Sequence, residues 1–176
     1  MIVVVLGGSR SGKSELAERW AASLGAPVTY LATYRTMRDS SVNPGIDEDM
    51  ARRIDAHRQR RPSDWATREV AEDLPAVLAV VAGTVLLDSL GTWIAAHQDF
   101  SADVEGLCAA LGTRSGHAVV VSDEVGLGVH PETALGRRFR DALGGANRAV
   151  AEVADRCVLV VAGRVLELRP AESVWP

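Results

Sequence analysis

Residues 7 to 14 carry the clearest chemical signal in this sequence. They read Gly-Gly-Ser-Arg-Ser-Gly-Lys-Ser and match G-x-x-x-x-G-K-[ST], the pattern of a phosphate-binding P-loop. In such a loop the glycines let backbone N–H groups converge on phosphate oxygens at the start of a helix. Lys13 would reach the β- and γ-phosphates, and the Ser14 hydroxyl would bind Mg²⁺. The predicted phosphate-binding residues are Gly7, Gly8, Ser9, Arg10, Ser11, Gly12, Lys13 and Ser14.

Lys13 is distinctive for a second reason. Of the 19 basic residues in the chain, it is the only lysine and all the others are arginine. A compact ammonium group on a thin stem fits a backbone cradle around phosphates better than a planar guanidinium does. We therefore predict that Lys13 is a catalytic residue.

Two acidic residues follow apolar runs and are candidates for holding the metal of a bound nucleotide. Asp88 follows Val85 to Leu87, and Asp123 follows Val119 to Val121. We favour Asp88, together with Ser14, because Asp123 opens a glycine-rich stretch that is typical of a loop. The alternative is that either acid only caps the helix that follows it.

A histidine within a basic cluster is the second candidate site. The cluster contains Arg52, Arg53, His57, Arg58, Arg60 and Arg61. Guanidinium groups this close repel one another unless anions lie between them, so the cluster favours bound phosphates. A solvated arginine-rich helix face is the alternative. Nearby cations favour the neutral form of the His57 imidazole, which could attack an α-phosphorus and form a phosphoramidate.

The elements that must position these residues alternate along the chain. Apolar runs predict strands at 2–6, 27–33, 84–87 and 118–122, and helical periodicity predicts helices at 13–24, 47–60, 69–81, 89–96, 104–111 and about 139–153. A loop is expected at 34–46 and a hairpin at 157–161 and 165–168. This pattern indicates an α/β fold of the P-loop NTPase kind, with a mostly parallel sheet, helices on both faces and a C-terminal hairpin. We expect one nucleotide-binding domain, 1–170, and a tail, 171–176.

Composition excludes several classes of protein. The 176 residues are 47% hydrophobic and 24% charged, which suits one folded domain rather than a disordered chain. The formal net charge of −4 argues against a nucleic-acid surface. No apolar run approaches the roughly 20 residues of a membrane helix, so we expect a cytoplasmic protein without stable membrane insertion. Cys108 and Cys157 form no CxxC pair, and we expect buried thiols rather than a disulfide or a zinc site.

Several segments together resemble a known family. They are GGSRSGKS at 7–14, YLAT at 30–33, MARRIDAHRQRRPSDW at 50–65, LLDSLGTW at 86–93 and VSDEVGLGVHPETALGRRFRDALGGANR at 121–148. They follow the order found in the bifunctional adenosylcobinamide kinase and adenosylcobinamide-phosphate guanylyltransferase of cobalamin synthesis. The P-loop is shared by many families, but H-R-x-x-R-P-x-x-W and E-V-G-x-G together are specific.

The resemblance implies two reactions. A nucleoside triphosphate, ATP or GTP, phosphorylates adenosylcobinamide, and GTP guanylylates a histidine that passes GMP to adenosylcobinamide phosphate. By matching position, His57 would be the guanylylated residue. The implied nucleotide contacts beyond the P-loop are Ala32, Thr33, Tyr34, Arg58, Gln59, Arg60, Arg61, Glu69 and Asp88. The resemblance also implies Mg²⁺ as cofactor, a corrinoid substrate and a homo-oligomer, with a trimer suggested.

The chain departs from the family pattern at two positions and in one loop. Asp123 stands where the family usually has Asn, Arg148 stands where it commonly has Gln, and the loop at 35–47 is longer than typical. Two other functions are compatible with the motifs. One is a small-molecule kinase in which His57 is structural, and the other is a nucleotide-gated binding protein that is not an enzyme.

Overall fold

A seven-stranded sheet forms the centre of the computed structural model, which describes residues 1–33 and 62–174. The strand order is β3-β2-β4-β5-β1-β6-β7. The strands are β1 (Ile2–Gly7), β2 (Val28–Ala32), β3 (Ala66–Glu69), β4 (Thr84–Asp88), β5 (Ala118–Asp123), β6 (Arg156–Val161) and β7 (Arg164–Leu168). All paired strands run parallel except β6 and β7, which form an antiparallel hairpin. The predicted parallel sheet and C-terminal hairpin are confirmed.

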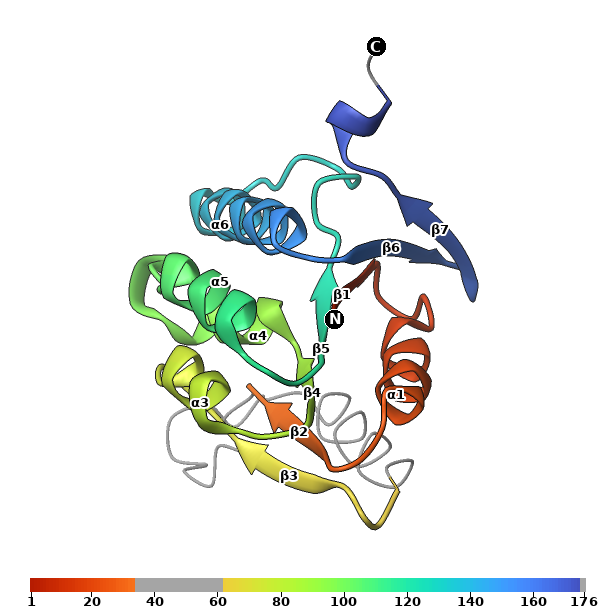
Figure 1. The fold of residues 1–176 in the computed structure, drawn as a ribbon. Helices are drawn as coiled ribbons and strands as arrows, with labels where there is room; N and C mark the ends of the chain where they lie inside the picture. Colours follow the sequence, from red (N-terminus) through yellow and green to blue (C-terminus); the bar gives the residue numbers. More distant parts are fainter. Residues whose placement is uncertain (34–61, 175–176) are drawn as a thin grey trace.

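Helices cover both faces of the sheet. The described helices are α1 (Lys13–Ser23), α3 (Leu74–Val80), α4 (Leu90–Ala96), α5 (Val104–Thr113) and α6 (Ala134–Glu152), with short 3₁₀ turns at Gln98–Phe100 and Ala171–Ser173. Figure 1 shows α3, α4, α5 and α6 on one face and α1 on the other. Among the residues that the structure describes, no helix is both long and apolar enough to cross a membrane.

One predicted helix starts too early, and the strand before it was not predicted. The sequence predicted a single helix over 69–81, but β3 ends at Glu69 and α3 begins only at Leu74. Pro75 lies in the first turn of α3, where a missing N–H costs nothing, so it marks a helix start. Strand β3 is short, lies at the edge of the sheet and has exposed side chains. It therefore lacks the apolar run by which the inner strands were found.

The strand valines alternate between two apolar cores. On β1, Val4 packs with the α3–α6 side, whereas Val3 and Val5 pack with the α1 side. All three are fully buried, as expected of a parallel strand covered on both faces. The two cores together hold the strands in one rigid layer.

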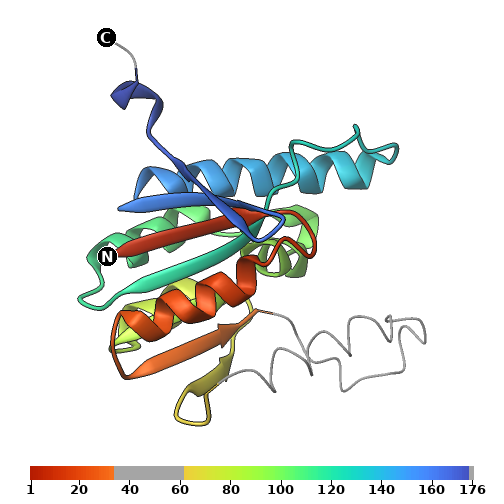
Figure 2. The same cartoon turned by 90° about the vertical axis from the view of Figure 1, so that its right-hand side faces the viewer.

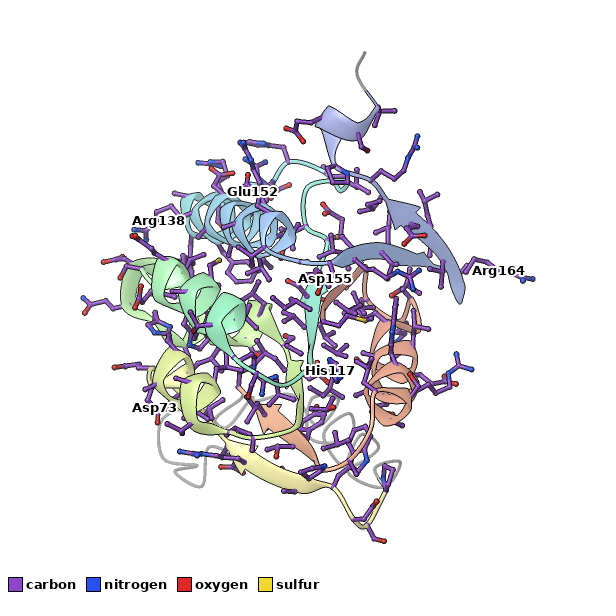
Figure 3. All side chains as sticks on the ribbon, viewed as in Figure 1. Asp73, His117, Arg138, Glu152, Asp155 and Arg164 are labelled. Carbon is purple, nitrogen blue, oxygen red and sulfur yellow. The ribbon has the colours of Figure 1, made fainter. Side chains whose placement is uncertain are left out.

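The carboxyl ends and the amino ends of the parallel strands form two opposite edges of the sheet, and these carry different groups. Parallel pairing puts the carboxyl ends of β1, β4 and β5 at one edge, and Figure 2 shows β1 and β5 ending there, where α1 turns back along the sheet. At the opposite edge, the Asp155 carboxylate accepts a hydrogen bond from the Ile2 amide at 2.6 Å, and His117 Nδ1 lies 3.1 Å from the Met1 amino group. Figure 3 labels Asp155 and His117 around this amino end of β1. The candidate site therefore lies at the carboxyl edge, where ligands of open α/β sheets bind.

The predicted loop at 34–46 and helix at 47–60 lie outside the described residues, as do the last two residues of the predicted tail.

Candidate functional site

The P-loop sequence connects β1 to α1, as predicted. Strand β1 ends at Gly7 and α1 begins at Lys13. Between them the chain turns through left-handed conformations at Arg10 (φ 57°) and Gly12 (φ 95°). Gly12 is the N-cap of α1 and, as a glycine, has no side chain that could accept from the first N–H groups of the helix. These donors point out of the helix end, where a phosphate is favoured by hydrogen bonding and by the helix dipole.

The P-loop packs closely against the turn of the β6–β7 hairpin. The Gly163 amide donates a hydrogen bond to the Ser11 carbonyl at 2.9 Å. A Cβ added at Gly7 would lie 2.5 Å from Ser11 Oγ and 2.8 Å from the Val160 carbonyl oxygen, so only glycine fits there. The hairpin turn thus holds the backbone of the P-loop in place from outside the β1–α1 connection.

Lys13 forms an ion pair with Asp123. Its ammonium nitrogen lies 2.8 Å from Asp123 Oδ1 and 3.2 Å from the Gly8 carbonyl oxygen, to which it donates. The Lys13 side chain is 13% exposed and that of Asp123 is 42% exposed. Asp123 ends β5, and it pairs with Gly7 in the neighbouring strand β1. Asp123, which we expected to be a less suitable metal ligand than Asp88, is therefore the ion-pair partner of Lys13.

Asp88 ends β4, on the far side of β5 from the P-loop strand. Its Oδ2 accepts a hydrogen bond of 2.6 Å from the hydroxyl of Tyr30, a residue that is 1% exposed. The carboxylate is therefore oriented by a rigid phenol from β2. Because the carboxyl ends of β1, β4 and β5 meet at one edge, the structure brings Asp88 and the P-loop to the same side of the sheet.

The oxygen donors at this edge suit magnesium. A P-loop metal needs a hydroxyl, a carboxylate and the phosphates themselves, with water completing the shell. Ser14 in the first turn of α1 and Asp88 at the end of β4 supply the first two. Within residues 1–33 and 62–174, no group of three or more His, Cys, Asp or Glu residues could hold a metal alone.

The other predicted nucleotide contacts among the described residues are Ala32, Thr33 and Glu69, and they differ in burial and in distance from the P-loop strand. Ala32 and Thr33 are buried, at 0% and 1% exposure. The Thr33 hydroxyl donates to the Ser89 carbonyl at 2.7 Å and accepts from the Ser89 amide at 3.0 Å, so it fixes the chain directly after Asp88. Glu69 is exposed at the end of β3, and β2, β4 and β5 separate that strand from the P-loop strand. The structure does not bring Glu69 beside the P-loop.

The remaining predicted site residues are Tyr34, His57, Arg58, Gln59, Arg60 and Arg61, and they lie outside the described residues. The chain enters that segment from the carboxyl end of β2, at the same edge as the P-loop.

Asn147 is a supporting residue that the sequence analysis did not single out. It lies on α6, is 7% exposed, accepts a hydrogen bond from the Ser122 hydroxyl at 2.6 Å and donates to the Asp123 carbonyl at 3.0 Å. It therefore anchors the end of β5, and with it the Asp123 backbone. An asparagine among apolar residues at helical spacing was the available signal, because a buried amide requires partners.

Comparisons with known proteins identify the family. The model of the cobinamide kinase / cobinamide phosphate guanyltransferase family matches residues 3–168. The bifunctional adenosylcobalamin biosynthesis protein CobP of Pseudomonas aeruginosa is 38% identical over 94% of this chain and 96% of its own length. The corresponding protein CobU of Escherichia coli is 32% identical over 93% and 97%.

A solved structure supports the fold alone. The flagellar accessory protein FlaH from Methanocaldococcus jannaschii superposes with a TM-score of 0.50 at 16% identity, covering 93% of this chain and 74% of that one. This agrees with the P-loop NTPase-like fold expected from the sequence. With the family model and the two relatives, the resemblance found in the sequence is confirmed: the chain belongs to the cobinamide kinase / cobinamide phosphate guanyltransferase family of bifunctional enzymes in cobalamin biosynthesis.

Proposed function

We propose that the P-loop holds the triphosphate for the kinase reaction, with Lys13 as the catalytic cation. The hydroxyl of adenosylcobinamide attacks the γ-phosphorus of ATP or GTP. A new O–P bond forms, the bond from the γ-phosphorus to the bridging oxygen breaks, and the hydroxyl proton passes to solvent. Negative charge that shifts onto the bridging oxygen is stabilised by Lys13 and by the N–H groups at the start of α1. The observation that carries this proposal is the placement of Lys13 at the carboxyl edge, at the start of α1.

Magnesium is the cofactor in this proposal. Ser14 and Asp88 would hold it, and it would supply positive charge against the phosphate oxygens. Tyr30 would act as a positioning residue, because its hydroxyl fixes one oxygen of Asp88. Thr33 is proposed to support the nucleotide site through the Ser89 contacts described above, with Ala32 and Tyr34 beside it in the chain. Glu69 is not part of this proposal, because β2, β4 and β5 separate its strand from the P-loop strand.

The second reaction in this proposal uses His57. The neutral imidazole attacks the α-phosphorus of GTP, an N–P bond forms and pyrophosphate leaves, while the other ring nitrogen releases its proton. A phosphate oxygen of adenosylcobinamide phosphate then attacks the same phosphorus. The N–P bond breaks while the ring takes a proton back from solvent, which restores the neutral imidazole and yields adenosylcobinamide-GDP. Arg58, Arg60 and Arg61, with Gln59 beside them, would hold the phosphates during transfer. The family assignment and the motif HRQRRPSDW at 57–65 support this role.

Labelling with α-³²P-GTP tests the assignment of His57. We expect wild-type protein to retain an acid-labile, base-stable label, and mass spectrometry to find GMP on the peptide that contains residue 57. His57→Ala should lose the label and keep phosphorylation of adenosylcobinamide. His117→Ala is the matched control, because His117 lies at the opposite edge of the sheet beside the Met1 amino group, and it should keep both activities. A GMP adduct in His57→Ala would refute the assignment.

We also propose that the protein acts in the cytoplasm as a homo-oligomer, with a trimer as the expected form. The exposed side chains of Val165 and Leu166 on the edge strand β7, at 53% and 60%, are compatible with a contact between subunits. Light scattering of the purified protein measures the oligomer directly. A monomer at all concentrations would refute this part of the proposal.

A further inference from the structure

The ion pair between Lys13 and Asp123 neutralises the cation on which a bound triphosphate depends. Lys13 Nζ lies 2.8 Å from Asp123 Oδ1, and its other hydrogen bond goes to the Gly8 carbonyl. The lysine side chain is largely buried, at 13% exposure, so the pair is only partly screened by water. A phosphate must therefore displace a carboxylate before it can use the full charge of Lys13.

Asp123 is held where it cannot move far from an incoming phosphate. Its backbone is fixed by strand pairing with Gly7 and by the hydrogen bond from the Asn147 amide to its carbonyl at 3.0 Å. Its Oδ2 lies 3.2 Å from the position of a Cβ added at Gly91, in the first turn of α4. The carboxylate thus lies between Lys13 and the helix that follows Asp88, with the side chain 42% exposed to water. Once displaced from Lys13, it remains a negative charge beside the phosphates.

We propose that Asp123 makes this site select the magnesium-bound nucleotide over the magnesium-free nucleotide, by competing with the phosphates for Lys13. This inference rests on the proposed role of the P-loop in nucleotide binding. A magnesium-free triphosphate must replace the Asp123 carboxylate on Lys13 and then bear its repulsion. The same exchange costs less for the magnesium complex, because the metal charge offsets part of the phosphate charge. Asp123 acts here as a specificity-determining residue, separate from the predicted metal ligands Ser14 and Asp88.

The variant Asp123→Asn tests the effect of the negative charge separately from the effect of side-chain shape. Its side chain has nearly the same size, and its Oδ1 can still accept from Lys13 without carrying a negative charge. Asp123→Asn therefore removes the competition but preserves the shape of the site. The matched control is Glu167→Gln, which removes one negative charge from an exposed ion pair with Arg156 on the hairpin, 2.9 Å across.

The test is calorimetric titration of a non-hydrolysable GTP analogue, once with excess Mg²⁺ and once with excess EDTA. For Asp123→Asn we expect the magnesium-free analogue to bind about fivefold tighter than it does to wild type, a size set by a partly screened ion pair. Binding of the magnesium complex should change less than about twofold. Glu167→Gln should change neither value. The selectivity ratio, rather than either affinity, is the diagnostic readout.

Several results would overturn the inference. Equal tightening of both forms would mean that Asp123 acts only through general repulsion. Weaker magnesium-free binding in Asp123→Asn would mean that the carboxylate supports the site. Loss of binding of the magnesium complex alone would make Asp123 a metal ligand. Wild-type protein that binds the analogue in neither condition would instead refute the proposed P-loop function, so the two failures are distinguishable. Unchanged thermal unfolding of the variant confirms that the fold is intact.

Discussion

Tyr30 carries a buried hydroxyl that fixes one oxygen of Asp88, a proposed metal ligand. It donates to Asp88 Oδ2 at 2.6 Å from a side chain that is 1% exposed. Tyr30→Phe keeps the ring and removes the donor, so we expect a loss of about 1 kcal/mol in the free energy of unfolding. We also expect the magnesium concentration for half-maximal kinase rate to rise, because Asp88 loses its fixed orientation. Steady-state rates over a magnesium titration measure this. An unchanged magnesium requirement would show that Tyr30 serves stability alone.

Lys13 offers a prediction that separates charge from shape. Lys13→Ala should abolish phosphorylation, because it removes the only ammonium at the P-loop. Lys13→Arg keeps the charge and can still pair with Asp123, but its planar guanidinium does not fit the space of an ammonium. We expect both variants to lose at least about a hundredfold in kinase rate, about 2.7 kcal/mol of barrier. Full activity of Lys13→Arg would mean that charge alone is sufficient.

The sequence identified the individual P-loop residues, whereas their long-range partners became visible only in the structure. Lys13 and Ser14 could be identified from spacing, because the P-loop pattern is local and fixes their chemistry. The pairing of Lys13 with Asp123 could not, because those residues are far apart in sequence and meet only through the pairing of β1 with β5. His57 was found from a local cluster and a resemblance, and its role stays a prediction.

At the scale of elements, Asn147 ties α6 to β5. Its amide group serves both the fully buried Ser122 hydroxyl and the Asp123 carbonyl. Asn147→Ala leaves both groups without this partner, and we expect it to lower the free energy of unfolding by about 1–3 kcal/mol. The neighbouring Arg148→Ala removes only an exposed pair with Glu152 and should cost less than about 0.5 kcal/mol. Urea unfolding of the two variants compares them. Equal destabilisation would contradict the anchoring role of Asn147.

The β6–β7 hairpin provides a second element-scale test. Gly163 has a φ of +70° and donates to Ser11, while a Cβ added there meets no atom within 4 Å. Gly163→Ala therefore adds only backbone strain, about 1 kcal/mol, and should leave nucleotide affinity unchanged. Gly163→Pro removes the N–H and, because proline fixes φ near −65°, also breaks the turn, so it should weaken nucleotide binding, as calorimetry would measure. Equal affinities for the two variants would show that the hairpin does not support the P-loop.

Strands and helices with a strong apolar pattern could be predicted from the sequence. A strand that depends mainly on pairing with its neighbour could not. The apolar runs of β1, β4 and β5 identified them as buried strands. Strand β3 carries Ala-Thr-Arg-Glu, with every side chain exposed, and forms only because β2 offers it an edge to pair with. No local period marks such a strand, and the glutamate at its end was therefore assigned to a helix.

On the scale of the whole molecule, partial burial disfavours ionisation of the thiols of Cys108 and Cys157. Burial raises the pKa of Cys157, and burial together with the nearby negative charge of Glu152 raises the pKa of Cys108. Because the thiolate is the reactive form, both should be alkylated by iodoacetamide at least about tenfold more slowly in folded protein than in urea. Mass spectrometry of quenched samples follows the reaction. Rapid labelling of either thiol in folded protein would contradict this expectation.

The same shifts predict a dependence of stability on pH. A thiol whose pKa is raised in the folded state contributes its full stability below the ordinary thiol pKa, about 8.5. That contribution is lost as the pH rises through the raised value, because the unfolded chain ionises first. Cys157→Ala should therefore flatten the decline of the unfolding free energy at alkaline pH. An identical decline in the variant would assign the loss to other groups.

The order of the strands is also a property of the whole molecule that the sequence did not reveal. A parallel sheet with helices on both faces followed from the alternation of patterns. That β5 would lie between β1 and β4, and so put Asp123 nearer to the P-loop than Asp88, depends on long-range pairing that no short motif encodes.

The fully buried run Val119, Val120 and Val121 on β5 has a consequence for alignment. Where both sides of a strand are covered and successive side chains are identical, a shift by one position exchanges valine for valine and meets little opposition from packing. Such a shift would move Asp123 out of its pairing with Gly7 and put Ser122 or Glu124 there, depending on its direction. The side-chain amide of Asn147 bonds to the Ser122 hydroxyl and the Asp123 carbonyl. These two hydrogen bonds form in only one register of β5 and therefore fix it.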